Sequence, residues 1–192
     1  MLYNIVLFLH IIGVLLMFIG VGVTLTAMLG TLHARTVEAL RSWSGLAKKA
    51  DGLLPLSVIF ILLPGGYLVS QGWTWSAAWV AISLTTLVLM TVMGPVINLT
   101  RIKAIHTAAC EAAEGPLTAE LHAIVRNKAL WNSVSIMTML AVAIVFLMTV
   151  KPGFAGSLLA LAIAVPAGLF ASAGMRKQGA APAASAAKIK KA

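Results

Sequence analysis

Charged side chains are scarce in this sequence. Only 10% of its 192 residues are Asp, Glu, Lys or Arg, whereas a soluble domain carries about 25%. Hydrophobic residues make up 60% of the chain, so a water-soluble globule would lack the polar surface needed to cover its interior. The composition therefore excludes an ordinary soluble domain and favours lipid as the medium around the chain.

Cysteine is almost absent as well, since Cys110 is the single one. This excludes an intramolecular disulfide and a metal site built from several thiolates. The nine methionines are scattered through the apolar runs, a distribution more typical of apolar packing than of a copper site. We therefore predict no metal site. The net charge of +9 indicates membrane topology and anionic lipid rather than a nucleic-acid partner.

Four long stretches contain no charged residue at all: 1–34, 52–100, 129–150 and 152–175. A helix needs about 20 apolar residues to cross the hydrocarbon core. Three stretches therefore hold one crossing each, and the second is long enough for two. Single strands cannot cross, because their backbone groups would lie unpaired in lipid. We predict an all-α polytopic bundle within 1–177, with five spans at about 2–32, 53–71, 77–99, 130–150 and 154–175.

The segments between the spans carry patterns of their own. The segment 34–50 alternates apolar and charged residues at helical spacing, which favours a helix lying in the membrane interface. The segment 101–128 predicts a cytoplasmic helical hairpin broken at Gly115-Pro116. The segment 178–192 predicts a disordered basic tail. Inside the spans, Pro64-Gly65-Gly66 and Gly94-Pro95 predict kinks or breaks.

Basic residues are distributed very unevenly over the two sides that the five spans define. One side receives 13 of the 14 Lys and Arg residues, and the other receives only Lys151. The cytoplasmic side of a membrane protein carries the excess of Lys and Arg. We therefore predict that the N-terminus lies outside and the C-terminus inside, in the cell inner (plasma) membrane.

Two places in the spans are candidates for chemistry. His10 lies early in the first span, where an ionisable side chain is a candidate functional residue. The simpler alternative is that it bonds a carbonyl or hydroxyl of a neighbouring span. Pro64, Gly65 and Gly66 should lie at a similar depth, where a distorted helix could form a ligand site or a pathway. The spans contain no Asp or Glu, so we predict no catalytic residue and no proton-coupled carrier.

The segment Leu9-His10-Ile11-Ile12-Gly13-Val14, with Gly20 ten residues after the histidine, resembles the first helix of two membrane families. These are the CopD-like proteins and HemJ, the membrane protoporphyrinogen oxidase. The early histidine is thought to ligate haem in HemJ-like proteins. The resemblance therefore implies haem b as the cofactor, with His10 as an axial ligand.

Later features look closer to a bacterial family of predicted integral membrane proteins that have no assigned function. They are the basic segment after the first span, the Pro64–Tyr67 sequence, the tryptophans at the outer turn, and Arg101 after the third span. This resemblance covers roughly residues 5–150. It implies a membrane bundle and assigns no activity.

Three functions stay open from the sequence. The first is a non-enzymatic inner-membrane protein, as a subunit or accessory protein, with lipid around it and a homo-oligomer or a membrane complex as its context. The second is a haem-b-binding redox protein of the CopD or HemJ type that uses His10. The third is a small-molecule permease with its pathway at Pro64, Gly65 and Gly66.

Overall fold

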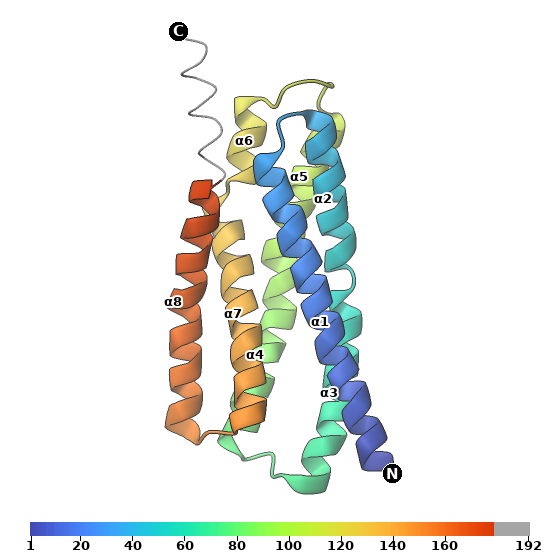
Figure 1. Cartoon of the computed structure of the whole chain (residues 1–192), viewed down its shortest axis with the longest axis vertical. Helices are drawn as coiled ribbons and strands as arrows, with labels where there is room; N and C mark the ends of the chain where they lie inside the picture. Colours follow the sequence, from blue (N-terminus) through green and yellow to red (C-terminus); the bar gives the residue numbers. More distant parts are fainter. Residues whose placement is uncertain (179–192) are drawn as a thin grey trace.

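The computed structural model describes residues 1–178 as long helices joined by short turns (Figure 1). Five helical stretches, three of which join two or more of the elements below, are long and apolar enough to cross a membrane, which confirms the predicted all-α bundle with five spans. The elements are α1 (Leu2–His33), α2 (Val37–Asp51), α3 (Leu54–Gly72), α4 (Ala78–Met93), the π-helix η1 (Gly94–Leu99), α5 (Thr100–Glu111), α6 (Ala119–Val125), α7 (Lys128–Val150) and α8 (Phe154–Gln178). The predicted tail at 178–192 lies outside the described residues, apart from Gln178.

The outer surface of the bundle is apolar. In the most hydrophobic part of each span, between 17% and 33% of the residues are buried inside the protein. The remaining side chains face outward, and many are large and hydrophobic, such as Leu63 at 73% exposure and Phe170 at 84%. Patches this extensive are not left open to water. Lipid therefore has to cover the sides of the bundle.

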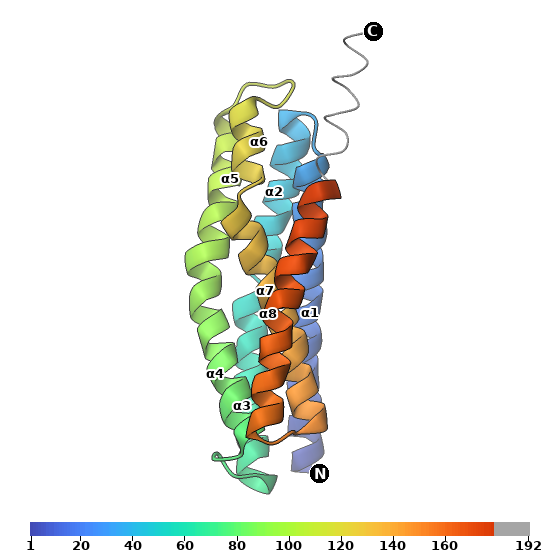
Figure 2. The same ribbon diagram turned by 90° about the vertical axis from the view of Figure 1, so that its left-hand side faces the viewer.

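The bundle has two halves along its long axis (Figures 1 and 2). One half holds α2, α5, α6 and the end of α1, and the other holds the turns that join α3 to α4 and α7 to α8. Each half has its own apolar core. The first core is centred on Trp131, Leu40 and Ile102, and the second on Met17, Ile61 and Leu87.

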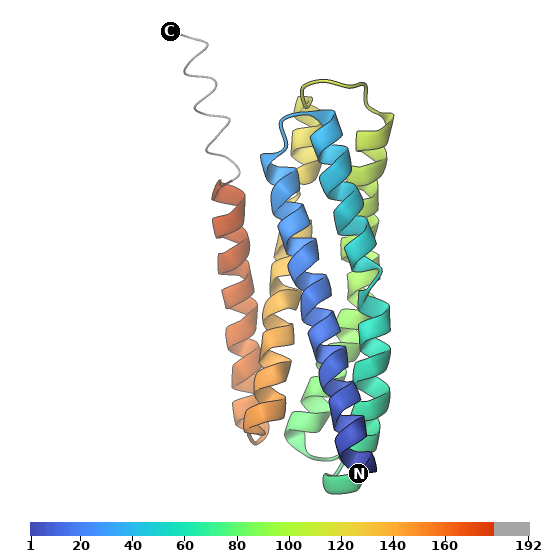
Figure 3. The same ribbon diagram turned by 45° about the vertical axis from the view of Figure 1, so that its right-hand side comes forward.

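The helix expected at 34–50 is present as α2, but its direction differs from the expectation. It runs along the bundle, in line with α3 and beside α1 (Figure 3), whereas the sequence predicted a helix lying across the membrane interface. Its apolar face, which includes Val37, Leu40 and Ala47, is buried against α1 and α5. An amphipathic stripe suits lipid and protein partners equally well, so the pattern alone did not fix the direction.

The loop at Gly115-Pro116 is joined to the turn between α1 and α2. Val37 N donates to Gly115 O at 2.9 Å, and Gly115 N donates to a carboxylate oxygen of Glu38 at 3.1 Å. Gly115 has φ 131°, a backbone conformation that favours glycine. The hairpin predicted at 101–128 is seen as α5, this loop and α6. The join to α1 and α2 was not predicted.

The two proline sites behave differently. The sequence predicted a kink or a break at Pro64-Gly65-Gly66. Helix α3 continues through Pro64, so the break is wrong, and the kink stays a prediction. Membrane helices tolerate proline where neighbouring groups satisfy the backbone, and His10 of α1 bonds the carbonyl of Ile61 nearby. At Gly94-Pro95, by contrast, the helix widens into η1.

Helices α1 and α3 approach most closely at Gly13. A Cβ atom added there would lie 2.7 Å from the carbonyl carbon of Phe60 and 2.9 Å from the backbone nitrogen of Ile61. A small residue is what permits two membrane helices to pack backbone against backbone. Gly22, on the same helix, has no atom within 4 Å of an added Cβ.

We therefore expect Gly13→Ala to destabilise the protein by about 1–3 kcal/mol, the usual effect of overpacking. Gly22→Ala is the matched control, and it should be neutral or stabilising by up to about 1 kcal/mol because alanine is the better helix former. Thermal unfolding of the two purified variants in detergent measures the difference. Equal midpoints would contradict the observed α1–α3 packing.

Candidate functional site

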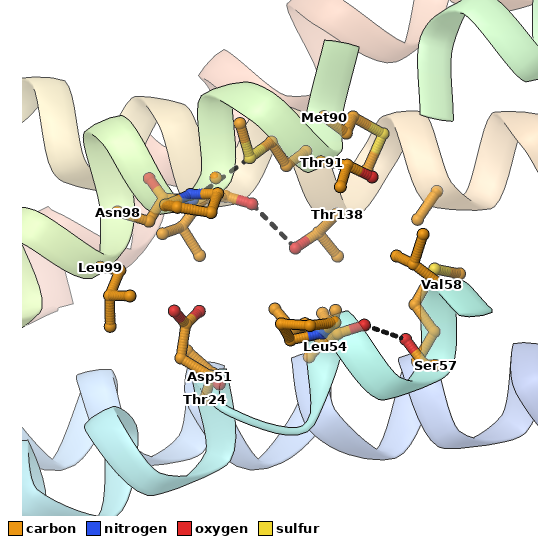
Figure 4. Close-up of a pocket in the computed structure, with 18 of the residues that line it drawn as sticks. Thr24, Asp51, Leu54, Ser57, Val58, Met90, Thr91, Asn98, Leu99 and Thr138 are labelled. Carbon is orange, nitrogen blue, oxygen red and sulfur yellow. Dashed lines mark hydrogen bonds between the residues drawn. The ribbon is translucent and has the colours of Figure 1, made fainter. Parts of the chain in front are cut away.

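A cavity of about 170 Å³ lies between the two apolar cores (Figure 4). Its walls come from α1, the turn between α2 and α3, the start of α3, the end of α4 with η1, and α7. Most of the lining is aliphatic. The polar side chains and the sulfur-containing side chains in the lining are Thr24, Asp51, Ser57, Thr91, Asn98, Thr138, Met17, Met90 and Met137.

Asn98 reaches this cavity from the π-helix. The wider turn of η1 begins at Gly94-Pro95, and a π-turn inside an α-helix is a frequent feature of functional sites. The side-chain amide nitrogen of Asn98 donates to Sδ of Met137 at 3.2 Å. Its Oδ1 is buried and has no hydrogen-bond partner among the described residues. Asn98 as a whole is 7% exposed.

Thr24 contributes a second unpartnered group from α1. Its residue exposure is 5%, and its Oγ1 is buried with no hydrogen bond to a described residue. A buried polar atom without a partner costs about 1–3 kcal/mol. Native proteins therefore satisfy nearly all such atoms with protein groups, water or ligand. Among the described residues, the buried side-chain oxygens without a partner belong to Thr24, Ser83, Asn98 and Ser135. Thr24 and Asn98 are the two of these residues that line the cavity.

The other hydroxyl groups in the cavity wall donate hydrogen bonds to backbone carbonyl groups of their own helices. Ser57 donates to Leu54 O at 2.7 Å, Thr91 to Leu87 O at 2.8 Å and Thr138 to Val134 O at 2.9 Å. Their oxygens keep free lone pairs. These groups can therefore accept a hydrogen bond from a bound molecule.

Asp51, the last residue of α2, closes one side of the cavity. Its half-buried carboxylate is directed into the space between α3 and η1, across from Asn98 (Figure 4). Burial raises the pKa of the Asp51 carboxyl, and the charge of Lys103 on α5 opposes this shift. The cavity thus combines one acidic group, one amide oxygen and several hydroxyl oxygens within aliphatic walls, a composition typical of ligand sites.

His10 lies elsewhere, between α1 and α3. Its Nδ1 donates to the carbonyl oxygen of Ile61 at 2.9 Å. A Cβ atom added at Gly65 would lie 3.1 Å from Cε1 of the imidazole, so the ring occupies the space that this glycine leaves. This is the arrangement of the simpler alternative, a histidine that bonds a carbonyl of a neighbouring span.

The bond from His10 Nδ1 to Ile61 O does not decide for or against haem, because a histidine that ligates a metal through Nε2 also donates its Nδ1 proton to a carbonyl. One turn further along α1, Gly13 brings the backbone of α1 against that of α3, which leaves no gap between these helices for a macrocycle. His10 does not line the cavity of 170 Å³. The other three histidines, His33, His106 and His122, belong to the half of the bundle with α2, α5 and α6. Haem binding stays a prediction from the resemblance.

The sequence also placed a ligand site or pathway at Pro64, Gly65 and Gly66. None of the three lines the cavity. Gly65 faces His10, and an added Cβ at Gly66 would contact the indole of Trp75 at 3.7 Å. The cavity borders α3 nearer its start, at Leu54 to Val58.

Sequence reasoning missed Asp51, Asn98 and Thr24 as site residues. The sequence contained one signal for Asn98 as a site residue. It is an amide at the inner end of an apolar span, three residues after Pro95 of the Gly94-Pro95 pair. Asp51 looked like an ordinary acid at the cytoplasmic boundary. Thr24 gave no signal, because threonine in a membrane helix normally bonds its own backbone.

The five apolar helices and their lipid-covered sides define an integral membrane helical bundle with an internal cavity. Within that class, the chain belongs to the family described as "Predicted integral membrane protein (DUF2269)", which matches residues 4–152. This confirms the resemblance seen over residues 5–150. No curated protein and no solved structure matches the chain.

The unpartnered hydroxyl of Thr24 gives a test of the site. Thr24→Val keeps the shape and removes a buried polar atom, so the ligand-free protein should be stabilised by about 1–3 kcal/mol. Thr91→Val is the matched control, and it should destabilise by about 0.5–1.5 kcal/mol because it removes a hydrogen bond. Thermal unfolding in detergent compares them. Equal destabilisation by both changes would show that Thr24 has a partner.

Proposed function

We propose that this chain is a non-enzymatic protein of the cell inner membrane that binds a small molecule in the cavity between its two cores. The observation that carries the proposal is the largely aliphatic cavity of about 170 Å³ itself, whose lining includes the half-buried acidic residue Asp51 and the polar residues Asn98 and Thr24. In this role the protein acts as a sensing or accessory subunit of a membrane assembly. The chemistry of the lining suits binding and orienting a molecule.

A packed apolar core next to the cavity favours a binding function over permeation. The core formed by Met17, Ile61, Leu87, Ala141 and Ile144 packs between the cavity and the far ends of the spans. A pathway through the bundle would have to cross this packed core. Transport at Pro64–Gly66 has no further support, because His10 and Trp75 cover those glycines.

The proposed orientation has the N-terminus outside and the C-terminus inside. Support comes from α2, with Arg41, Lys48 and Lys49, and from α5, with Arg101 and Lys103, since both helices lie at one end of the bundle (Figure 1). The turn at the other end carries Lys151, whose Nζ lies 4.3 Å from the ring centre of Trp73. Tryptophan is enriched at membrane–water interfaces.

Reporter insertions test this orientation. Green fluorescent protein inserted after Gly115 should fluoresce, because that loop is expected in the cytoplasm. Alkaline phosphatase inserted after Pro152 should be active, because that turn is expected outside. The same two reporters exchanged between the sites should be silent. Equal behaviour of one reporter at both sites would contradict the five-span orientation.

A cavity-filling variant tests the binding function. Ala141 lines the cavity and is 1% exposed, whereas its neighbour Val142 is 48% exposed and faces outward. Cavities of about 150 Å³ hold one benzene ring, so benzyl alcohol is a suitable neutral probe. We expect saturable binding to the wild-type protein in nanodiscs by calorimetry, no such binding to Ala141→Phe, and unchanged binding to Val142→Phe.

The two variants also separate binding in the cavity from partition of the probe into lipid. Partition contributes equally to all three proteins and does not saturate at one site. Identical titrations for the wild-type protein and Ala141→Phe would remove the cavity as the binding site and contradict the proposed function.

A further inference from the structure

The cavity lies between two helices that follow each other in the chain and hardly touch. Helix α3 packs on α1 and α4 packs on α7, whereas α3 and α4 have few contacts with each other. Figure 4 shows the space between them, with Leu54 and Val58 of α3 on one side and Met90 of α4 and Asn98 of η1 on the other. The bundle is therefore loosely closed on this side.

Four residues that line the cavity are also exposed on the outside of the bundle. Gly52 and Pro55 lie at the start of α3, and Thr91 and Pro95 lie in α4 and η1. Residues that belong to both surfaces mark the place where the cavity opens. The surface next to them is the apolar one that lipid covers, as Val96 at 67% exposure illustrates. The cavity is therefore continuous with the hydrocarbon region of the bilayer.

The surface that an occupant of the cavity can reach is mostly apolar. Asn98 Oδ1 and Thr24 Oγ1 are buried beneath that surface and are out of its reach. What remains is mainly aliphatic carbon together with the thioethers of Met17, Met90 and Met137. Methionine side chains are flexible and fit apolar partners of irregular shape. These walls favour a hydrocarbon chain as the occupant.

Basic residues border the end of the cavity where Asp51 lies. Lys48 and Lys49 precede Asp51 on α2, and Arg101 and Lys103 follow η1 on α5. These two helices pack against each other, and the charge of Lys103 acts on the Asp51 carboxyl. Basic residues thus outnumber the one acidic residue at the proposed cytoplasmic boundary. Clusters of Lys and Arg at this boundary attract anionic lipid head groups.

We propose that the cavity takes one acyl chain of an anionic phospholipid from the cytoplasmic leaflet. The chain enters sideways between α3 and η1, and the head group stays at the boundary beside Lys49, Arg101 and Lys103. The volume of about 170 Å³ is close to that of cavities that hold a single aromatic ring. The cavity therefore takes a segment of the chain, and the rest stays in the bilayer. This inference rests on the proposed binding function and names its ligand class.

A photoreactive lipid tests the entry of the chain. Phosphatidylglycerol with a diazirine in one acyl chain is reconstituted with the full-length protein in phosphatidylcholine vesicles and photolysed. Mass spectrometry then maps the labelled peptides. We expect labels on Met137 and Thr138 of α7, which line the cavity and are half-buried.

Two glycines provide a variant that closes the opening and a matched control. Gly94 lines the cavity and Gly22 does not, and a Cβ atom added at either one meets no atom within 4 Å. Gly94→Phe should lower the labelling of the cavity peptide roughly tenfold, because the loss of about two buried methylene groups is enough for that ratio. Gly22→Phe should leave the labelling unchanged.

A second variant keeps the test valid if Gly94→Phe does not fold. Thr91→Phe closes the same opening about one turn earlier, and it should lower the labelling in the same way. Val92→Phe is its control, because Val92 is 61% exposed and does not line the cavity. It should label like the wild-type protein.

The preference for an anionic head group is tested with a second lipid. Phosphatidylcholine with the same diazirine chain should label the cavity peptide less than phosphatidylglycerol does. Lys49→Gln should lower the ratio of the two labelling yields roughly fivefold, the effect of about one basic residue near a membrane surface. Lys177→Gln removes an exposed lysine at the end of α8, away from the cavity lining, and it should keep the ratio.

The outcomes distinguish this inference from the proposed function. Labelling of the cavity peptide that is absent, or equal in the wild-type protein, Gly94→Phe and Thr91→Phe, would overturn the acyl-chain ligand. Saturable binding of benzyl alcohol in the same preparation would then leave the binding function standing. Absence of both labelling and benzyl alcohol binding would overturn both proposals. Equal labelling by the two lipids, or a ratio unaffected by Lys49→Gln, would overturn the anionic phospholipid.

Discussion

The structure depends on one constraint, that a backbone in hydrocarbon must satisfy its own hydrogen bonds. Helices α1, α3, α4, α7 and α8 meet it through their internal backbone hydrogen bonds, with exceptions at Pro64 and Pro166, and their outward side chains are left for lipid. Without a hydrophobic driving force between helices, close contact comes from small residues. Gly13 against Phe60 and Gly168 against Ile136 are the tightest backbone approaches of this kind.

The chain is longer than the membrane requires, and this extra length creates the site. At 1.5 Å per residue, the 32 residues of α1 extend well beyond a hydrocarbon core of about 30 Å. The excess packs with α2, α5 and α6 into the first core, around Trp131, whose indole nitrogen donates to Val125 O at 2.9 Å. The cavity lies where the two cores meet. There the wider turn of η1 and the junction between α2 and α3 interrupt regular packing.

Hydropathy predicted five apolar helices long enough to cross a membrane, because each charge-free stretch has few alternatives to a crossing helix. The direction of α2 and the distortions at the proline sites were harder to predict. The apolar stripe of α2 does not say whether lipid or protein covers it, and Pro64, where a kink or a break was predicted, does not break α3. His10 drew attention because a lone ionisable group in a span is conspicuous. Asp51, Asn98 and Thr24 come together only through packing between distant segments, which no local pattern encodes.

The central claim is that a bound molecule occupies the cavity whose lining includes Asp51, Asn98 and Thr24. An electron cryomicroscopy structure of the full chain in lipid nanodiscs, with an antibody fragment to add mass, tests it most directly. The expected result is density in the cavity beside Asp51 that belongs to no protein atom. A structure in which α4 closes on α7 and protein side chains fill this space would contradict the claim.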